Sequence, residues 1–325
     1  MNFSDIKGQR DILSSLLNAL RHDKTGHAYI FTGPEGIGKR TVAKAFAKAL
    51  LCTGGSETGC DRCTACKLMN SESNPDFRMI DNGNNTVSVD IIREMREDMF
   101  LMPTHSARKV YVIANAHNMT VQAQNSMLKI FENPPSYAVV ILTTPRYREL
   151  AETIRSRAIT FHFRRNTDQE VYEALKEYGG NIENIDFLTA YAQGIIGKAL
   201  SMAASPELNG KRERLFKIIA GGCEDRISFL RDSMNFFSDN RNDAELLLDI
   251  MQTVYRDAIN VLISTRKDKL INTDKKDIIL NMASMHTVAG LIKKIEIIED
   301  TKIKLRNNVN YELAIEVMLL ELQEV

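Results

Sequence analysis

The feature that most constrains this chain is a glycine-rich loop, Gly33-Pro-Glu-Gly-Ile-Gly-Lys39, between an apolar run and a helix-forming run. The apolar run is 27–31, and the helix formers occupy 41–50. Strand, glycine loop and helix is the context of a phosphate-binding loop. There the glycines turn backbone N–H groups toward an anion, the helix N-terminus adds positive potential, and the lysine reaches the terminal phosphates. The predicted phosphate or nucleotide site is formed by Gly33, Gly36, Gly38 and Lys39.

One position of this loop departs from the motif. The pattern G-x-x-x-x-G-K-[ST] places a hydroxyl after the lysine to hold Mg²⁺, and Arg40 stands there instead. The loop is therefore built to hold a phosphate but poorly equipped to hydrolyse it. A glycine-rich turn without a ligand is the alternative, so the binding of ATP or ADP stays open while hydrolysis is not expected.

Length and charge narrow the class of protein. A chain of 325 residues favours two or three domains. Basic and acidic residues number 42 each, so no global field draws the chain to nucleic acid. The first residues lack the long apolar core of a signal peptide, and no apolar run approaches membrane-spanning length. We therefore expect a cytoplasmic protein without a membrane segment, in which cysteines bind metal rather than form disulfides.

Apolar runs alternate with helical patterns in the first half of the chain. This alternation predicts right-handed crossovers and a five-stranded parallel sheet that helices cover on both faces. From residue 164 onward only helical patterns remain, so the fold class is α/β plus all-α. The expected strands are 27–31, 76–80, 109–113, 137–143 and 159–163, and the expected helices include one capped by Ser4, 89–102, 120–132, 168–178, 184–193 and 197–204. The expected domains are 1–165, a helical lid at 166–207 and a helical domain at 208–325.

Four cysteines follow the helix after the loop, spaced Cys52-x₇-Cys60-x₂-Cys63-x₂-Cys66. Four thiolates this close can complete a tetrahedral shell, and C-x₂-C is a usual chelating arm for zinc. An iron–sulfur cluster is the rival, but a ferredoxin motif continues with C-x₃-C-P, which residues 67–70 do not supply. The sequence predicts a structural Zn²⁺ within an insertion at 52–66. Cys223 stands alone, and we expect it to be an inert helical residue.

The loop, the cysteine insertion and the helical C-terminal half together resemble the bacterial clamp-loader subunits of DNA polymerase III, in the AAA+ class. The resemblance covers nearly all 325 residues. It implies an AAA+ sheet domain with a zinc module, a small helical lid and a helical C-terminal collar domain through which subunits join. Further matching stretches are Ile6-Lys-Gly-Gln9, Asn125-Ser-Met-Leu-Lys-Ile-Phe-Glu-Asn-Pro-Pro135, Ser156-Arg157 and Asn308-Val-Asn310.

Two kinds of subunit share this fold, the ATP-hydrolysing gamma/tau motor and the non-hydrolysing delta-prime stator. Motor subunits follow the third strand with a carboxylate pair, where this chain has Ala114 and Asn115. They also carry an arginine in the lid helix, where this chain has Gly197. Alanine cannot coordinate a metal and an amide is no general base. With Arg40 these losses predict the stator kind.

Arg157 matches the arginine of the family's Ser-Arg-Cys motif, with Ala158 in place of the cysteine. The resemblance implies that Arg157 acts in trans, as an arginine finger on a neighbouring subunit's ATP. A solvated arginine favoured by the dipole at a helix end is the simpler alternative. Thr143 and Thr144 end the fourth strand where the family's sensor 1 residue sits. The implied partners are gamma/tau and delta subunits, with the sliding clamp and primed DNA reached through the complex.

Two rival functions remain. An active gamma/tau-type ATPase with unusual metal ligation predicts hydrolysis by the isolated chain, against which the missing carboxylates argue. A zinc-dependent DNA-binding module predicts a basic face around the cysteines. There Arg62 and Lys67 are opposed by Glu57 and Asp61, which disfavours that function.

Overall fold

A computed structural model describes residues 2–83, 85–179, 182, 184–205, 207–220, 226–263 and 270–325. The chain divides into two compact units, one made of residues 1–174 with 194–198 and the other of 175–193 with 199–325. The lid predicted at 166–207 contributes residues to both units, and the three-domain division stays a prediction. Within the described ranges no helix is both long and apolar enough to cross a bilayer.

The first unit is built on a parallel sheet with the strand order β2-β3-β4-β1-β5. Every residue of β1, β3 and β4 is buried, which explains why these strands appear in the sequence as continuous apolar runs. The predicted five-stranded parallel sheet is confirmed. Since all strands run the same way, their carboxyl ends meet at one edge, where the loop after β1 also lies. The strands are β1 (Ala28–Thr32), β2 (Phe77–Ile80), β3 (Lys109–Ile113), β4 (Ala138–Thr144) and β5 (Ile159–His162).

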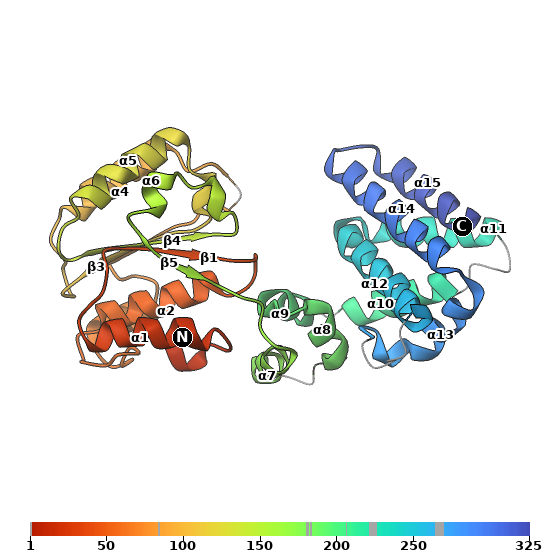
Figure 1. Ribbon diagram of the computed structural model, residues 1–325, viewed down its shortest axis with the longest axis horizontal. Coiled ribbons are helices and arrows are strands. Elements are labelled where there is room, and N and C mark those ends of the chain that lie inside the picture. The colour runs from red at the N-terminus through yellow and green to blue at the C-terminus, as the bar shows by residue number, and fades with distance from the viewer. Residues whose placement is uncertain are drawn as a thin grey trace. The chain divides into compact units, whose positions relative to one another are not determined.

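Helices cover both faces of this sheet (Figure 1). One apolar core forms between the sheet and α1 (Arg10–Arg21) and α2 (Lys39–Leu51). The other forms against α4 (Val89–Met99), α5 (Val121–Glu132) and α6 (Glu152–Arg155). The remaining elements of this part of the chain are η1 (Phe3–Asp5), α3 (Thr64–Asn70), η2 (Ala116–Asn118), η3 (Tyr147–Glu149) and α7 (Asp168–Tyr178).

The first helix begins later than predicted. Ser4 lies in the short 3₁₀ element η1 and does not cap α1, which starts at Arg10. The reason is local, because Gly8 has a φ of 73° and Gln9 a φ of 55°. Two consecutive left-handed residues interrupt a right-handed helix, so Ile6 lies outside α1.

The helix predicted at 89–102 ends at Met99. The amide of Phe100 bonds to the carbonyl of Glu97, three residues back, which tightens the last turn into 3₁₀ geometry. Pro103 then prevents further helix. The residues between, Phe100, Leu101 and Met102, are exposed.

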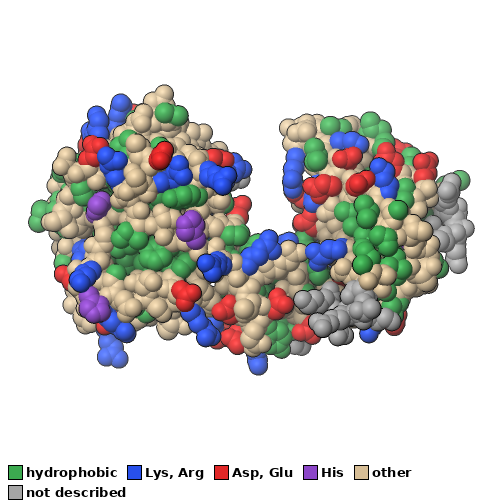
Figure 2. All heavy atoms as spheres, in the orientation of Figure 1, with side chains coloured by type: hydrophobic (Ala, Val, Ile, Leu, Met, Phe, Trp, Pro, Cys, Tyr) green, Lys and Arg blue, Asp and Glu red, His purple; other side chains and the backbone are tan. Residues whose placement is uncertain are grey.

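The second unit is helical throughout its described residues. Its centre is α12, which packs against α10, α13 and α14, while α15 packs against α11 and α14. Basic and acidic side chains are interspersed over the visible face of each unit (Figure 2), and their totals are equal in the whole chain. The helices from residue 185 onward are α8 (Ile185–Ala192), α9 (Ile196–Ala203), α10 (Leu208–Ala220), α11 (Arg226–Asp239), α12 (Ala244–Ile263), α13 (Lys276–Met285), α14 (Val288–Arg306) and α15 (Tyr311–Glu324), with η4 (Arg241–Asp243) and η5 (Thr273–Lys275) between them.

A buried arginine ties several helices of the second unit together. Arg212 of α10 is 1% exposed, and its guanidinium donates to both oxygens of Asp274 at 2.7 Å and to the side chain of Asn272 at 3.0 Å. The same group stacks over Phe187 of α8, 3.8 Å from the ring centroid. Asp257 of α12 accepts the amide of Asn272 at 2.8 Å, so the network joins α8, α10, α12 and η5.

Replacing Arg212 with Ala is expected to lower the free energy of unfolding of the second unit by about 3 kcal/mol, because it leaves Asp274 and Asn272 without their charged donor. Arg231→Ala is the matched control, since that arginine is 70% exposed and lies 3.9 Å from Asp232. The control should change the free energy by less than about 0.5 kcal/mol. Urea denaturation followed by circular dichroism measures the free energy of unfolding of both variants. Equal effects of the two substitutions would show that the buried network stabilises the unit no more than the exposed arginine does.

Candidate functional site

The glycine-rich loop joins β1 to α2, as predicted, and needs its glycines. Gly33 has a φ of 149° and Gly36 a φ of 73°. A Cβ at Gly33 would lie 2.6 Å from the carbonyl oxygen of Phe163, too close for any side chain. Gly38, with a φ of 103°, immediately precedes α2, and Lys39 is the first residue of that helix. The four predicted loop residues therefore lie together at the carboxyl edge of the sheet.

The loop lysine contacts the loop itself. Lys39 is 7% exposed, and its ammonium donates to the carbonyls of Gly33 at 2.8 Å and Pro34 at 2.7 Å. Burial lowers the pKa of Lys39 to about 8, although the nearby carboxylate of Glu35 opposes this shift. The ammonium that a loop of this kind directs at a phosphate is therefore hydrogen-bonded to two carbonyl oxygens of the loop.

Arg40, in the place of the metal-binding hydroxyl, forms a two-pronged ion pair. Its guanidinium lies 2.7 Å and 3.0 Å from the two carboxylate oxygens of Asp81, which directly follows β2. Because the pair is planar and bidentate, it fixes the arginine beside the start of α2. At this position the chain therefore has a guanidinium that is paired with a carboxylate, and not a hydroxyl that could bind Mg²⁺.

The positions after β3 carry no carboxylate. Ala114 is buried at 1% exposure, and Asn115 adopts a φ of 50° and donates its amide to the carbonyl of Gly83 at 2.9 Å. Thr144, at the end of β4, accepts the amide of Arg146 at 3.0 Å and lies 3.4 Å from Nδ1 of His117. Thr143 is also buried. Asn115 and Thr144 therefore bond to backbone groups, and Thr144 also contacts His117.

Gly197 packs directly on the loop. Its amide donates to the carbonyl of Gly36 at 2.9 Å, and a Cβ at Gly197 would lie 2.6 Å from that oxygen. An arginine at this position therefore requires the loop and the start of α9 to separate. Both residues belong to the first unit.

A second contact, which the sequence patterns do not predict, joins the same segment to the first unit. The backbone and side-chain amides of Asn166 donate to the carbonyl of Gly194 at 2.9 Å and 3.0 Å, and its oxygen accepts from Gln9 at 3.0 Å. A Cβ at Gly194 would meet the Asn166 carbonyl at 2.4 Å. Gly194 and Gln9 have positive φ values, 81° and 55°, which a sequence indicates only weakly.

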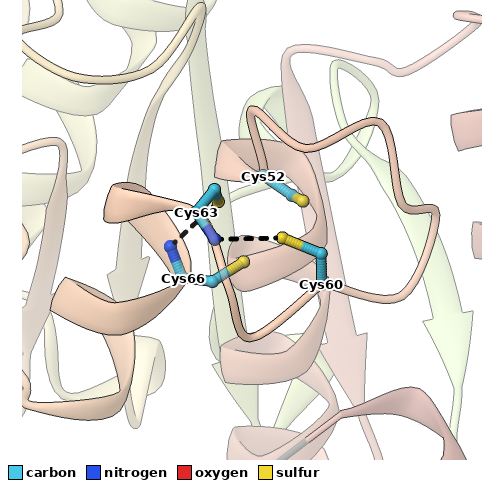
Figure 3. Close-up of side chains that lie close together, drawn as sticks. All are labelled: Cys52, Cys60, Cys63 and Cys66. Carbon is cyan, nitrogen blue, oxygen red and sulfur yellow. Dashed lines mark hydrogen bonds between the residues drawn. The ribbon is translucent and has the colours of Figure 1, made fainter.

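The four predicted cysteines come together. Their sulfurs all lie within 4.8 Å of one another, all four thiols are free, and the side chains converge (Figure 3). Cys52 directly follows α2, Cys63 caps α3 and Cys66 lies in its first turn. The amide of Cys63 donates to the sulfur of Cys60 at 3.3 Å, and that of Cys66 to the sulfur of Cys63 at 3.4 Å. Cys223 lies outside the described residues.

These donors suit thiolate ligands. Hydrogen bonds from the amides of Cys63 and Arg62 lower the pKa of Cys60. Burial opposes ionisation of Cys63, but hydrogen bonds from Thr53 and from the amide of Cys66 outweigh it and lower the pKa of Cys63 to about 5. Burial raises the pKa of Cys66 to about 12.

The backbone beside the four sulfurs also requires a glycine, at position 54. A Cβ at Gly54 would lie 2.6 Å from the sulfur of Cys60 and 3.8 Å from that of Cys52. Four convergent sulfurs, of which those of Cys60 and Cys63 accept backbone N–H bonds, are a donor set that fits a tetrahedral metal site. The residues present can therefore hold a metal ion of the thiolate-binding kind.

Arg157 follows α6 on the surface of the first unit. Its side chain is 40% exposed, and its guanidinium donates to the carbonyl of Thr153 at 3.2 Å and to the carboxylate of Glu132 at 3.4 Å. Exposed ion pairs of this kind contribute little to stability. The arginine is accessible from solvent and weakly held.

Comparison with known proteins gives one consistent relationship. The family described as DNA polymerase III, delta subunit, matches residues 8–167, and the one described as DNA polymerase III, delta subunit, C terminal, matches residues 211–324. DNA polymerase III subunit delta' of Bacillus subtilis is 27% identical over 319 residues, which covers 97% of this chain and 96% of that protein. Subunit tau of the same organism is 32% identical over 259 residues, covering 78% of this chain but only 42% of tau.

A solved structure shares the fold. The DNA polymerase III gamma subunit-related protein of Thermotoga maritima superimposes with a TM-score of 0.52 at 22% identity, covering 95% of this chain and 98% of that one. The family matches extend over both units, and the relationship to subunit delta' spans nearly the whole of both chains. The chain thus belongs to the delta-prime family of DNA polymerase III clamp-loader subunits.

Proposed function

We propose that this chain is the stator of its clamp loader, a subunit that does not hydrolyse ATP and supports the motor subunits as they load the sliding clamp on DNA. The observation that carries the proposal is the simultaneous loss of chemistry at four positions around an intact loop. Arg40 replaces the metal-binding hydroxyl, Ala114 and Asn115 replace the carboxylate pair, and Gly197 replaces the lid arginine.

These four positions act on different parts of phosphoryl transfer. The hydroxyl and the first carboxylate organise Mg²⁺, the second carboxylate orients the attacking water, and the arginine stabilises charge on the transferred group. Arg40 is tied to Asp81 and Asn115 to Gly83, so neither side chain is free to substitute for what is missing. The loss of catalytic groups at all four positions favours a site that does not hydrolyse ATP over an active site with unusual metal ligands.

The closed geometry of the loop supports the same proposal. A nucleotide phosphate entering the loop has to displace the Lys39 ammonium from two carbonyls. The contact between Gly36 and Gly197 holds the start of α9 against the loop. The backbone cradle itself persists, so weak binding of an anion, ADP or ATP is compatible with this arrangement, whereas turnover is not.

The partners follow from the family. Gamma/tau and delta subunits would join this chain through the C-terminal helical domain at 208–325, in the cytoplasm, and the sliding clamp and primed DNA would be reached through the complex. Large apolar side chains on α14 and α15 remain exposed in the isolated chain, among them Ile303, Leu313 and Leu320. Such exposed side chains suit contacts between subunits.

The metal of the cysteine site is proposed to be Zn²⁺, held by Cys52, Cys60, Cys63 and Cys66. Four cysteine sulfurs within 4.8 Å of one another favour zinc, and four sulfur ligands leave no position for a catalytic water. Its contribution there is structural: it joins the end of α2 to the start of α3. The cysteine site takes no part in the chemistry considered for the glycine-rich loop.

Elemental analysis of the untagged protein is expected to find one Zn²⁺ per chain, and Cys66→Ser, which removes the buried ligand, should lower that content well below one. Cys223→Ser serves as the control, because that cysteine is not among the four ligands, and it should leave the zinc content unchanged. Iron in place of zinc, or no metal with all four thiols reduced, contradicts the assignment.

The trans role of Arg157 is proposed because its position matches the family motif and its guanidinium is exposed. A planar, permanently charged group suits a developing phosphoryl charge at a subunit boundary. Its only carboxylate partner among the described residues is Glu132 at 3.4 Å, a pair that is easily exchanged for another anion.

In a loader reconstituted with gamma/tau and delta subunits, Arg157→Ala should leave assembly and zinc content unchanged while total ATPase falls partially and clamp loading falls further. An arginine finger contributes about 10³–10⁵ to the rate of the site it serves, so that one site should be silent. Arg21→Ala is the matched control, an exposed arginine that ends α1 and pairs with Glu57 at 2.5 Å. Wild-type rates in the Arg157 variant would make it an ordinary surface arginine.

A further inference from the structure

One carboxylate outside the set of metal ligands connects three elements around the cysteine site. Asp61 directly follows Cys60 and accepts hydrogen bonds from Lys48 of α2 at 2.5 Å, from Asn70 of α3 at 2.8 Å and from Asn2 at 2.6 Å. Lys48 also donates to the side-chain oxygen of Asn70 at 2.8 Å. These four side chains form one hydrogen-bonded cluster.

The cluster is partly removed from water. Lys48 is 3% exposed, whereas the Asp61 side chain is 43% exposed. Gly59, with a φ of 89°, packs on the lysine stem so closely that a Cβ there would lie 3.2 Å from its Cγ. A charge-assisted bond to a buried ammonium is stronger than an exposed ion pair. Glu57, which lies between Cys52 and Cys60, has only an exposed partner by contrast. It pairs with Arg21, and the two side chains are 42% and 54% exposed.

The spacing relates this cluster to the metal ligands. Lys48 lies four residues before Cys52, and Asn70 lies four residues after Cys66. Residues four apart share a helix face, so α3 presents the ligand Cys66 and the donor Asn70 on the same side. Lys48 lies in the last turn of α2, and Cys52 directly follows that helix. The Asp61 carboxylate therefore joins α2 to α3 one helical turn away from the sulfurs that a metal would join.

We propose that Asp61 is a positioning residue of the metal site: with Lys48 and Asn70 it holds the ends of α2 and α3 so that the four sulfurs converge before the metal arrives. This rests on the proposed metal assignment. Ordering the ligands in advance lowers the entropy cost of binding. Outer partners that orient metal ligands typically contribute 10–100-fold in metal affinity.

Metal affinity measured by competition with a coloured chelator tests this, using Zn²⁺ and Co²⁺ with the full chain. Asp61→Asn keeps one carbonyl oxygen and should weaken binding on the order of 10-fold, and Asp61→Ala should weaken it further. Lys48→Met keeps the apolar stem and should also weaken binding. Glu57→Gln is the matched control, a carboxylate in the same loop with only an exposed partner, and should stay within about twofold of wild type.

Two further measurements separate positioning from a general loss of structure. The Co²⁺–thiolate absorption of the loaded variants should match wild type, since the ligands are unchanged. Hydrogen exchange of the metal-free protein should show the amides of 64–70 protected in wild type and in Glu57→Gln but exchanging rapidly in Asp61→Ala, with the sheet protected in all three.

Equal metal affinity in the Asp61 variants and the control overturns the proposal. So does faster exchange of the sheet in metal-free Asp61→Ala, because it would make Asp61 a stabiliser of the whole unit. Wild-type protein that binds neither Zn²⁺ nor Co²⁺ overturns the metal assignment, and this inference with it.

Discussion

The structure of the first unit depends on a parallel sheet whose strands β1, β3 and β4 are completely buried. In such a sheet a ligand can be approached from the loops at the carboxyl ends of the strands. The glycine loop, Arg40 with Asp81, and the residues after β3 and β4 all meet there. The same edge therefore carries both the phosphate-binding loop and the residues on which the proposed absence of hydrolysis rests.

Polar groups in and beside the loop contact one another within the chain. The Lys39 ammonium bonds to loop carbonyls, Arg40 bonds to a carboxylate, and Gly197 bonds to the loop backbone. Each of these polar groups has a hydrogen-bond partner within the chain.

Much of this was predictable from the sequence, because the informative patterns are local. Continuous apolar runs located the strands, the loop follows a contiguous motif, and the four cysteines lie within one short insertion. What escaped prediction depends on backbone geometry or on distant pairs. Gly8 and Gln9 delay α1 through positive φ values, and Asn166 meets Gly194 across 28 residues. Asp61 has three donors at unrelated positions, and no periodicity links them.

The most direct measurement is the ATPase rate of the purified chain, beside Lys39→Ala and a gamma/tau subunit as the positive control. With no metal ligand, no base and the loop lysine held internally, the rate should equal background, and Lys39→Ala should not change it, while the gamma/tau subunit turns over normally. Hydrolysis well above background that disappears in Lys39→Ala would contradict the silent site and identify the chain as a motor subunit.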